Sequence, residues 1–130
     1  METIAKTDAF TVHVDVTKNR LYLMGRGFWK DVTVAQQFLA SVKQGIAQLS
    51  PGYSVLADLH EFKTPPPQVG EIIIESQKLS AQTVGKSAQV VGDNVGIAMP
   101  MSRYAHTSGI QGQNKSFATR AEAETWLDAV

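Results

Sequence analysis

Residues 53–67 place an apolar strand directly before a polar loop and three consecutive prolines, and this order restricts the fold more than any other segment does. Val55, Leu56, Ala57 and Leu59 form a nearly continuous apolar run, which is typical of a strand buried on both faces of a sheet with parallel members. The prolines suit the first turn of a helix but not its interior. The segment therefore predicts an open α/β fold, in which ligands and partners usually bind where strands end and helices begin.

The remaining elements follow from hydrophobic periodicity along the chain. The predicted strands span residues 9–16, 20–24, 53–59, 87–91 and 115–118. The predicted helices span residues 33–49, the prolines to residue 84, 97–108 and 119–130. This order predicts a single α/β domain over residues 1–130, with an N-terminal β-hairpin, β-α repeats and a mixed sheet of about five strands with about four helices. Residues 1–8 are expected to form a flexible N-terminal extension.

Local signals predict where some helices begin and end. Thr33 with Gln36, and Thr119 with Glu122, have the spacing of a capping box at a helix start. Gly85 is expected to be the C′ residue that follows the second helix.

Composition limits the possible function classes. Twelve basic residues balance twelve acidic ones, which argues against nucleic-acid binding because such proteins need a basic surface. The absence of cysteine excludes a thiol nucleophile and a disulfide scaffold. The N-terminal residues lack the apolar core of a signal peptide, and no stretch is long and apolar enough to span a membrane. We therefore expect a bacterial cytoplasmic protein, with peripheral membrane contact left open.

The chain resembles the SpoIIAA-like branch of the STAS fold, the fold of anti-sigma-factor antagonists. The resemblance covers nearly the whole chain. It depends on the N-terminal hairpin before a capped helix, on the strand that closes with Asp58-Leu59, and on residues 117–127, where a strand phenylalanine precedes a helix with Glu-Ala and Trp-Leu pairs. It implies this fold and a habit of binding a protein partner or a small apolar ligand. It implies no catalytic residue and no cofactor.

One family feature is missing. Antagonists of this fold carry a phosphorylated serine in an Asp-Ser-Ser-Gly segment at the start of the second helix. The matching segment here falls near Pro66-Pro67-Gln68-Val69 and contains neither serine nor threonine. Thr64 is the nearest hydroxyl and precedes the prolines. A phosphorylation-switched circuit is therefore not expected.

The C-terminal edge of the sheet is the expected site, because loops at that edge carry binding residues in open α/β folds. The edge should bring together residues from the ends of three strands. These candidates for ligand or partner binding are Arg26, Phe28, Trp29, Asp58, His60, Glu61, Asp93 and Asn94. The alternative for the charged members is an ordinary role as solvated or turn-capping residues.

An enzyme is the competing hypothesis for this edge. Asp58 and His60 share a side of an extended strand and could interact, whereas His60 and Glu61 should point to opposite sides. A small hydrolase would also need a nucleophile within hydrogen-bond reach, from Thr64 or Ser54, and no motif supports either. The three histidines are scattered, without the spacing of a metal site, so neither a metal nor another cofactor is expected.

An apolar group could line a pocket near the same edge. Phe28, Trp29, Met99, Met101 and Tyr104 combine aromatic rings with flexible methionines, which suit an adaptable apolar pocket. The alternative is filled core, which is the favoured interpretation for Met101 and Tyr104. The favoured function is thus a non-enzymatic binding or regulatory module for a partner protein or small apolar ligand. The alternatives are the hydrolase and a homodimeric interaction domain that pairs through an exposed edge.

Overall fold

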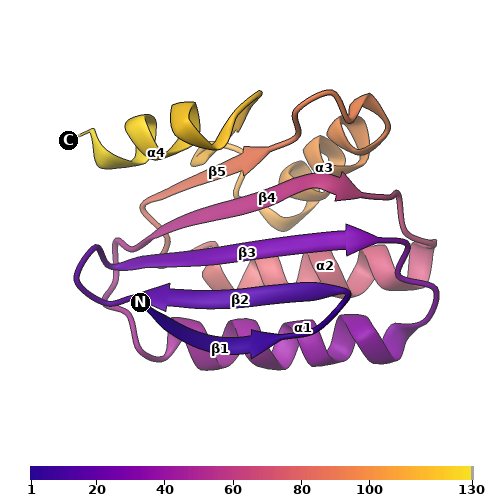
Figure 1. The fold of residues 1–130 in the computed structure, drawn as a ribbon, viewed down its shortest axis with the longest axis horizontal. Coiled ribbons are helices and arrows are strands. Elements are labelled where there is room, and N and C mark those ends of the chain that lie inside the picture. The colour runs from indigo at the N-terminus through magenta and orange to yellow at the C-terminus, as the bar shows by residue number, and fades with distance from the viewer. Residues whose placement is uncertain (130) are drawn as a thin grey trace.

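The computed structural model describes residues 1–129, which form a mixed sheet of six strands with four helices packed against it (Figure 1). The strands are β1 (Glu2–Lys6), β2 (Phe10–Asp15), β3 (Arg20–Gly27), β4 (Ser54–Phe62), β5 (Lys86–Val90) and β6 (Asn114–Phe117). The helices are α1 (Val32–Ile46), α2 (Pro67–Ser80), α3 (Val95–Ser108) and α4 (Arg120–Asp128). The predicted α/β class and mixed sheet are confirmed.

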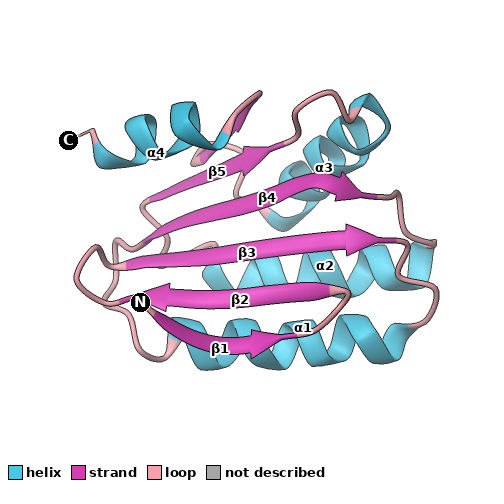
Figure 2. Cartoon of the chain, viewed as in Figure 1, coloured by secondary structure: helices cyan, strands magenta, loops and turns pink. Residues whose placement is uncertain are grey.

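The strands lie in sequence order across the sheet, from β1 to β6. β2 pairs antiparallel with both β1 and β3, whereas β3, β4, β5 and β6 run parallel. Figure 2 shows the alternation of strands and helices that these parallel pairs require. The carboxyl ends of the parallel strands therefore meet at one edge, which we call the C-terminal edge.

Helices cover the two faces of the sheet unequally. One face packs against α1, α2 and α3 in a large apolar core, and α4 covers a smaller core on the other face. β4 contributes Val55 to the large core and Leu56 to the small one, so it is buried on both faces as its apolar run predicts. In Figure 1 no helix lies over β1 and β2 on the α4 side of the sheet. No helix within residues 1–129 is long and apolar enough to cross a membrane.

The N-terminal segment differs from the prediction. Residues 2–6 form the edge strand β1, so the sheet has six strands rather than about five, and the flexible extension expected over residues 1–8 is wrong for most of that segment. β1 is held by main-chain pairing to β2, with an irregular register between Thr3 and Ala5. Only Ile4 and Ala5 pack on the core, so the sequence lacks the alternation that marks a half-buried strand.

Two helix starts show different capping. Asp31 caps α1, because its carboxylate accepts a hydrogen bond from the Thr33 N–H at 2.9 Å. The capping box expected at Thr33 is therefore wrong, and the helix begins at Val32. At α4 the prediction is confirmed, since Thr119 Oγ1 accepts from the Glu122 N–H at 3.2 Å.

The second helix ends earlier than its apolar pattern predicts. α2 ends at Ser80, and Gly85 lies in the turn before β5 instead of at the helix end. A Cβ at Gly85 would lie 2.7 Å from the carbonyl oxygen of Gly52, so close approach of two backbones requires glycine there. Val84 is buried in the large core, which explains why it extends the apolar pattern beyond the helix.

Candidate functional site

An irregularity in β4 builds the main side-chain cluster at the C-terminal edge. Met24 pairs with Asp58, but Arg26 pairs with Glu61, so β4 carries one extra residue relative to β3. Such a bulge lets two consecutive residues face the same side of a sheet. His60 and Glu61 both line the groove on the α4 side. The expectation that these two side chains point to opposite sides is therefore wrong.

His60 lies between two carboxylates. Its Nδ1 is 2.5 Å from Asp58 Oδ1, and its Nε2 is 3.3 Å from Glu61 Oε1. The predicted contact between Asp58 and His60 is thus present. Asp58 is buried, whereas His60 and Glu61 are exposed. The hydrogen bond to Asp58 is the main cause that raises the pKa of His60, with smaller contributions from the charges of both carboxylates.

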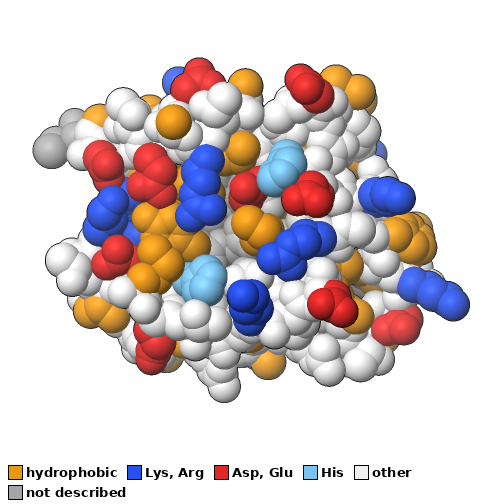
Figure 3. Space-filling view, viewed as in Figure 1, with side chains coloured by type: hydrophobic (Ala, Val, Ile, Leu, Met, Phe, Trp, Pro, Cys, Tyr) orange, Lys and Arg blue, Asp and Glu red, His pale blue; other side chains and the backbone are white. Residues whose placement is uncertain are grey.

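An open groove of about 720 Å³ surrounds this cluster. Its walls come from the ends of β4 and β5, the loop before α3 and the start of α4. The lining residues are Asp58, His60, Glu61, Phe62, Lys63, Val90, Gly92, Asp93, Asn94, Ala118, Thr119 and Arg120. Figure 3 shows histidine beside acidic side chains on this face of the molecule. The groove is therefore lined by charged side chains of both signs.

The side chain of Asn94 stabilises the backbone around the groove. Its Nδ2 donates to the carbonyl of Leu59 at 3.0 Å and to that of Phe62 at 2.6 Å. These carbonyls flank the bulge, where regular strand pairing is interrupted, and the side-chain amide satisfies them. Asn94 thus fastens the loop between β5 and α3 to the end of β4.

The groove also contains two basic residues that were not among the predicted site residues. Lys63 and Arg120 contribute its basic side chains, and the Arg120 guanidinium lies 5.3 Å from the centre of the Tyr22 ring. The capping pattern at Thr119 could have predicted the position of Arg120, because it places the start of α4 directly after the last parallel strand. Parallel strand ends share one edge, so Arg120 could have been placed there.

Arg26 lies outside this groove. It belongs to β3, which is longer than predicted, and its guanidinium donates to the Thr7 carbonyl at 3.1 Å and to Thr11 Oγ1 at 2.9 Å. It lines a separate groove of about 310 Å³ together with Lys6 and His13. The structure therefore does not bring Arg26 together with the Asp58–His60–Glu61 cluster.

The expected apolar group is divided between core and surface. Trp29, Met101 and Tyr104 are buried in the large core, so the core interpretation holds for the last two. Phe28 is 55% exposed and Met99 is 79% exposed. Trp29 does line an internal cavity, but Phe28 and Met99 do not. The five residues therefore do not form one pocket at the sheet edge.

The groove lacks the remaining parts of a hydrolase. Thr119 is the hydroxyl residue that lines it, and Thr119 Oγ1 donates to Glu122 Oε1 while it caps α4. Thr64 donates to the Gly96 carbonyl, and Ser54 accepts from Arg20. Within residues 1–129, no hydroxyl is hydrogen-bonded to His60, whose Nε2 lies beside Glu61 instead. In the part of the chain that the structure describes, no hydroxyl is therefore placed for His60 to activate as a nucleophile.

The charge state of this cluster gives a pH-dependent prediction. Because the folded protein favours protonated His60, its contribution to stability is fully present below pH 6.5 and is lost as the pH rises through the higher folded pKa. An NMR titration should place the pKa of His60 above 6.5, and Asp58→Asn should lower it. His13 is the internal comparison: burial, with the charges of Lys6 and Arg120, lowers its pKa below 6.5. Equal midpoints for both histidines would contradict this assignment.

Comparisons with known proteins identify the fold. No protein-family model matches this chain, and no curated protein matches it. The NMR structure of the protein TM1081 is 15% identical, with a TM-score of 0.61 over 97% of this chain and 94% of that one. The crystal structure of an anti-sigma factor antagonist from Mycobacterium paratuberculosis is 17% identical, with a TM-score of 0.57 over 96% and 99% of the two chains. The SpoIIAA-like STAS fold implied by the sequence resemblance is thus confirmed.

Proposed function

We propose that this protein is a non-enzymatic regulatory module that binds a partner protein at the C-terminal edge of its sheet. The observation that carries the proposal is the pair Val95 and Met99, which are 85% and 79% exposed. They lie four residues apart at the start of α3, so they share one face of that helix. Large apolar side chains this exposed, beside a groove with charged residues on its walls, are typical of protein interaction sites.

Hydrogen bonds between loops join this apolar pair to the rest of the edge. The Lys63 N–H donates to the Gly27 carbonyl at 2.9 Å, next to the exposed ring of Phe28. The Thr64 hydroxyl donates to the Gly96 carbonyl at 2.8 Å. That carbonyl lacks its usual helical partner four residues on, because Pro100 has no N–H. Phe28, the proline segment and α3 are thereby held as one surface, which favours docking without large rearrangement.

The fold supports the regulatory part of the proposal by likeness to an anti-sigma factor antagonist. The regulation we propose does not use a serine at the start of α2, since this helix begins at Pro67 after two further prolines. The hydrolase alternative is disfavoured because His60 lies between two carboxylates and not beside a nucleophile. Protonation of His60 is the charge change that this edge offers near neutral pH.

The experiment starts with a photo-crosslinking amino acid at position 99 and, as a control, at position 79 in the native host. Leu79 is also an exposed apolar helix residue, but it lies at the far end of α2. A protein crosslinked only through position 99 is identified and purified. Its affinity is then measured by calorimetry for the wild type, for Val95→Ser/Met99→Ser and for Leu79→Ser.

The proposal expects the double variant to weaken binding about tenfold or more, as loss of a central apolar contact usually does. Leu79→Ser should bind like the wild type. Equal weakening by both variants, or none by the double variant, would overturn the proposal. If the crosslinked protein is a second copy of this chain, and light scattering shows a dimer that the double variant abolishes, the homodimer replaces the partner protein.

A further inference from the structure

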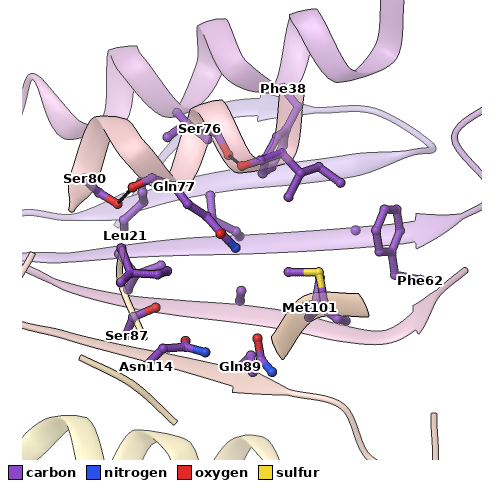
Figure 4. A pocket seen from close by; sticks show the side chains of 18 of the residues that line it. Leu21, Phe38, Phe62, Ser76, Gln77, Ser80, Ser87, Gln89, Met101 and Asn114 are labelled. Atoms are coloured by element: carbon purple, nitrogen blue, oxygen red, sulfur yellow. Dashed lines mark hydrogen bonds between the residues drawn. The ribbon is translucent and has the colours of Figure 1, made fainter. Parts of the chain in front are cut away.

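Polar side chains face each other inside the large core, where apolar ones are expected. Ser76, Gln77 and Ser80 of α2 lie opposite Ser87, Gln89 and Asn114 of β5 and β6 (Figure 4). Ser76, Ser80, Ser87 and Gln89 are all buried. Burial of polar groups is costly unless they form hydrogen bonds, so four buried polar residues around one cavity need an explanation.

The cavity between these rows has a volume of about 80 Å³ and is mostly apolar elsewhere. In Figure 4, Ser80, Ser87 and Asn114 lie toward one end, Phe62 and Met101 lie toward the other, and the Gln77 amide points between them. Trp29 and Phe38 also line the cavity. The cavity is therefore mainly apolar, with polar side chains from α2, β5 and β6 on its walls.

Most of the polar atoms around the cavity are already engaged. The hydroxyls of Ser76 and Ser80 donate to carbonyls of their own helix, at 2.7 and 2.9 Å. The Gln89 amide donates to Ser116 Oγ at 2.7 Å. Gln77 Oε1 is buried and, among residues 1–129, has no hydrogen-bond partner. A buried acceptor of this kind calls for a donor from a bound molecule.

We propose that this cavity binds a small amphipathic molecule that carries a hydroxyl group. The hydroxyl donates to Gln77 Oε1, and the carbon chain extends along the apolar wall toward Trp29 and Phe62. A cavity of roughly 150 Å³ accommodates benzene, so this smaller one suits roughly three to five non-hydrogen atoms. The inference does not depend on partner binding, because the cavity lies inside the core and the proposed docking surface lies outside it.

Trp29 provides the readout once the second tryptophan, Trp126, is replaced by phenylalanine. Trp126 packs on the opposite face of the sheet, so Trp126→Phe leaves the cavity intact. In this background, 1-butanol and its isomer diethyl ether are titrated while Trp29 emission is recorded. We expect a saturable change with butanol and binding about tenfold weaker with the ether, which cannot donate to Gln77.

Two variants and one control make the test specific. Gln77→Leu removes the acceptor and should abolish the preference for the alcohol, while Gln68→Leu, an exposed glutamine of the same helix, should preserve it. Ala57→Leu fills the cavity and should abolish both saturable responses. If Trp29 emission changed linearly with the butanol concentration, as in a bulk solvent effect, the proposal would be overturned. The cavity would then be assigned to bound water. If Gln77→Leu still preferred butanol to diethyl ether, the proposal would be overturned as well. This outcome does not depend on whether Ala57→Leu folds.

Discussion

Trp29→Ala should lower the free energy of unfolding by about 3–5 kcal/mol, the usual cost of removing a large aromatic side chain from a core. Trp29 is only 3% exposed, and its ring lies 4.9 Å from Phe62 and 5.2 Å from Phe38, measured between ring centres. Its indole N–H also donates to the Ala9 carbonyl at 3.2 Å. Equilibrium denaturation in urea, followed by circular dichroism, measures the change without relying on tryptophan emission.

Trp126→Ala is the matched control for this prediction. Trp126 is only partly buried and packs on Phe117 at 5.5 Å between ring centres, on the smaller core. Trp126→Ala removes less buried apolar area, so it should lower the free energy of unfolding by clearly less than Trp29→Ala does. If Trp29→Ala cost less than Trp126→Ala, Trp29 would not be the centre of the aromatic core described above.

The adjacent pair Phe28 and Trp29 shows where sequence patterns stop being informative. Both lie between β3 and α1, and a loop has no period that assigns one aromatic to the core and the other to solvent. Gly27 adopts a φ of 67°, which turns the chain just before the pair. The outcome, buried Trp29 and exposed Phe28, depends on contacts with Phe10 and Phe62 that are distant in sequence.

In the candidate site, too, some features could be predicted from the sequence and others could not. The strand before the prolines and the contact between Asp58 and His60 could be predicted, because burial on both faces and period two are properties of one strand. The position of the Glu61 side chain beside His60 could not be predicted. It depends on a bulge, which is defined by the register between β4 and β3 and not by β4 alone. The internal cavity could not be predicted either, because Gln77 and Gln89 come to line the same space only through the packing of α2 on the sheet.

Arg20 is the second position where we expect a large effect. It is buried at the N-terminal end of β3, and its Nε donates to Ser54 Oγ at 2.8 Å. Its two terminal nitrogens reach Glu124 at 2.8 Å and Asp128 at 2.9 Å, both on α4. This buried guanidinium therefore attaches α4 to the sheet, in addition to the apolar contacts that Ala123, Trp126 and Leu127 make there.

Arg20→Met should lower the free energy of unfolding by about 3 kcal/mol, at the low end for breaking a buried ion pair. Methionine keeps an unbranched apolar stem but leaves Asp128 without its cation and Glu124 with only the more exposed Lys18, at 3.6 Å. The side chains of Glu124 and Asp128 retain 24% and 54% exposure, so water can compensate them in part. Because the loss acts on α4, its amides should exchange hydrogen faster while those of α1 keep their protection.

Asp128→Asn serves as the control for the charge, since it removes the more exposed partner and leaves Glu124 to pair with Arg20. Asp128→Asn should lower the free energy of unfolding by about 0–1 kcal/mol, the usual contribution of a surface ion pair. This loss should be smaller at high salt concentration. The Arg20→Met cost should be much less sensitive to salt, because burial limits screening. Equal costs for the two variants, or equal loss of amide protection in α1 and α4, would mean that Arg20 stabilises the sheet generally and does not fasten α4 to it.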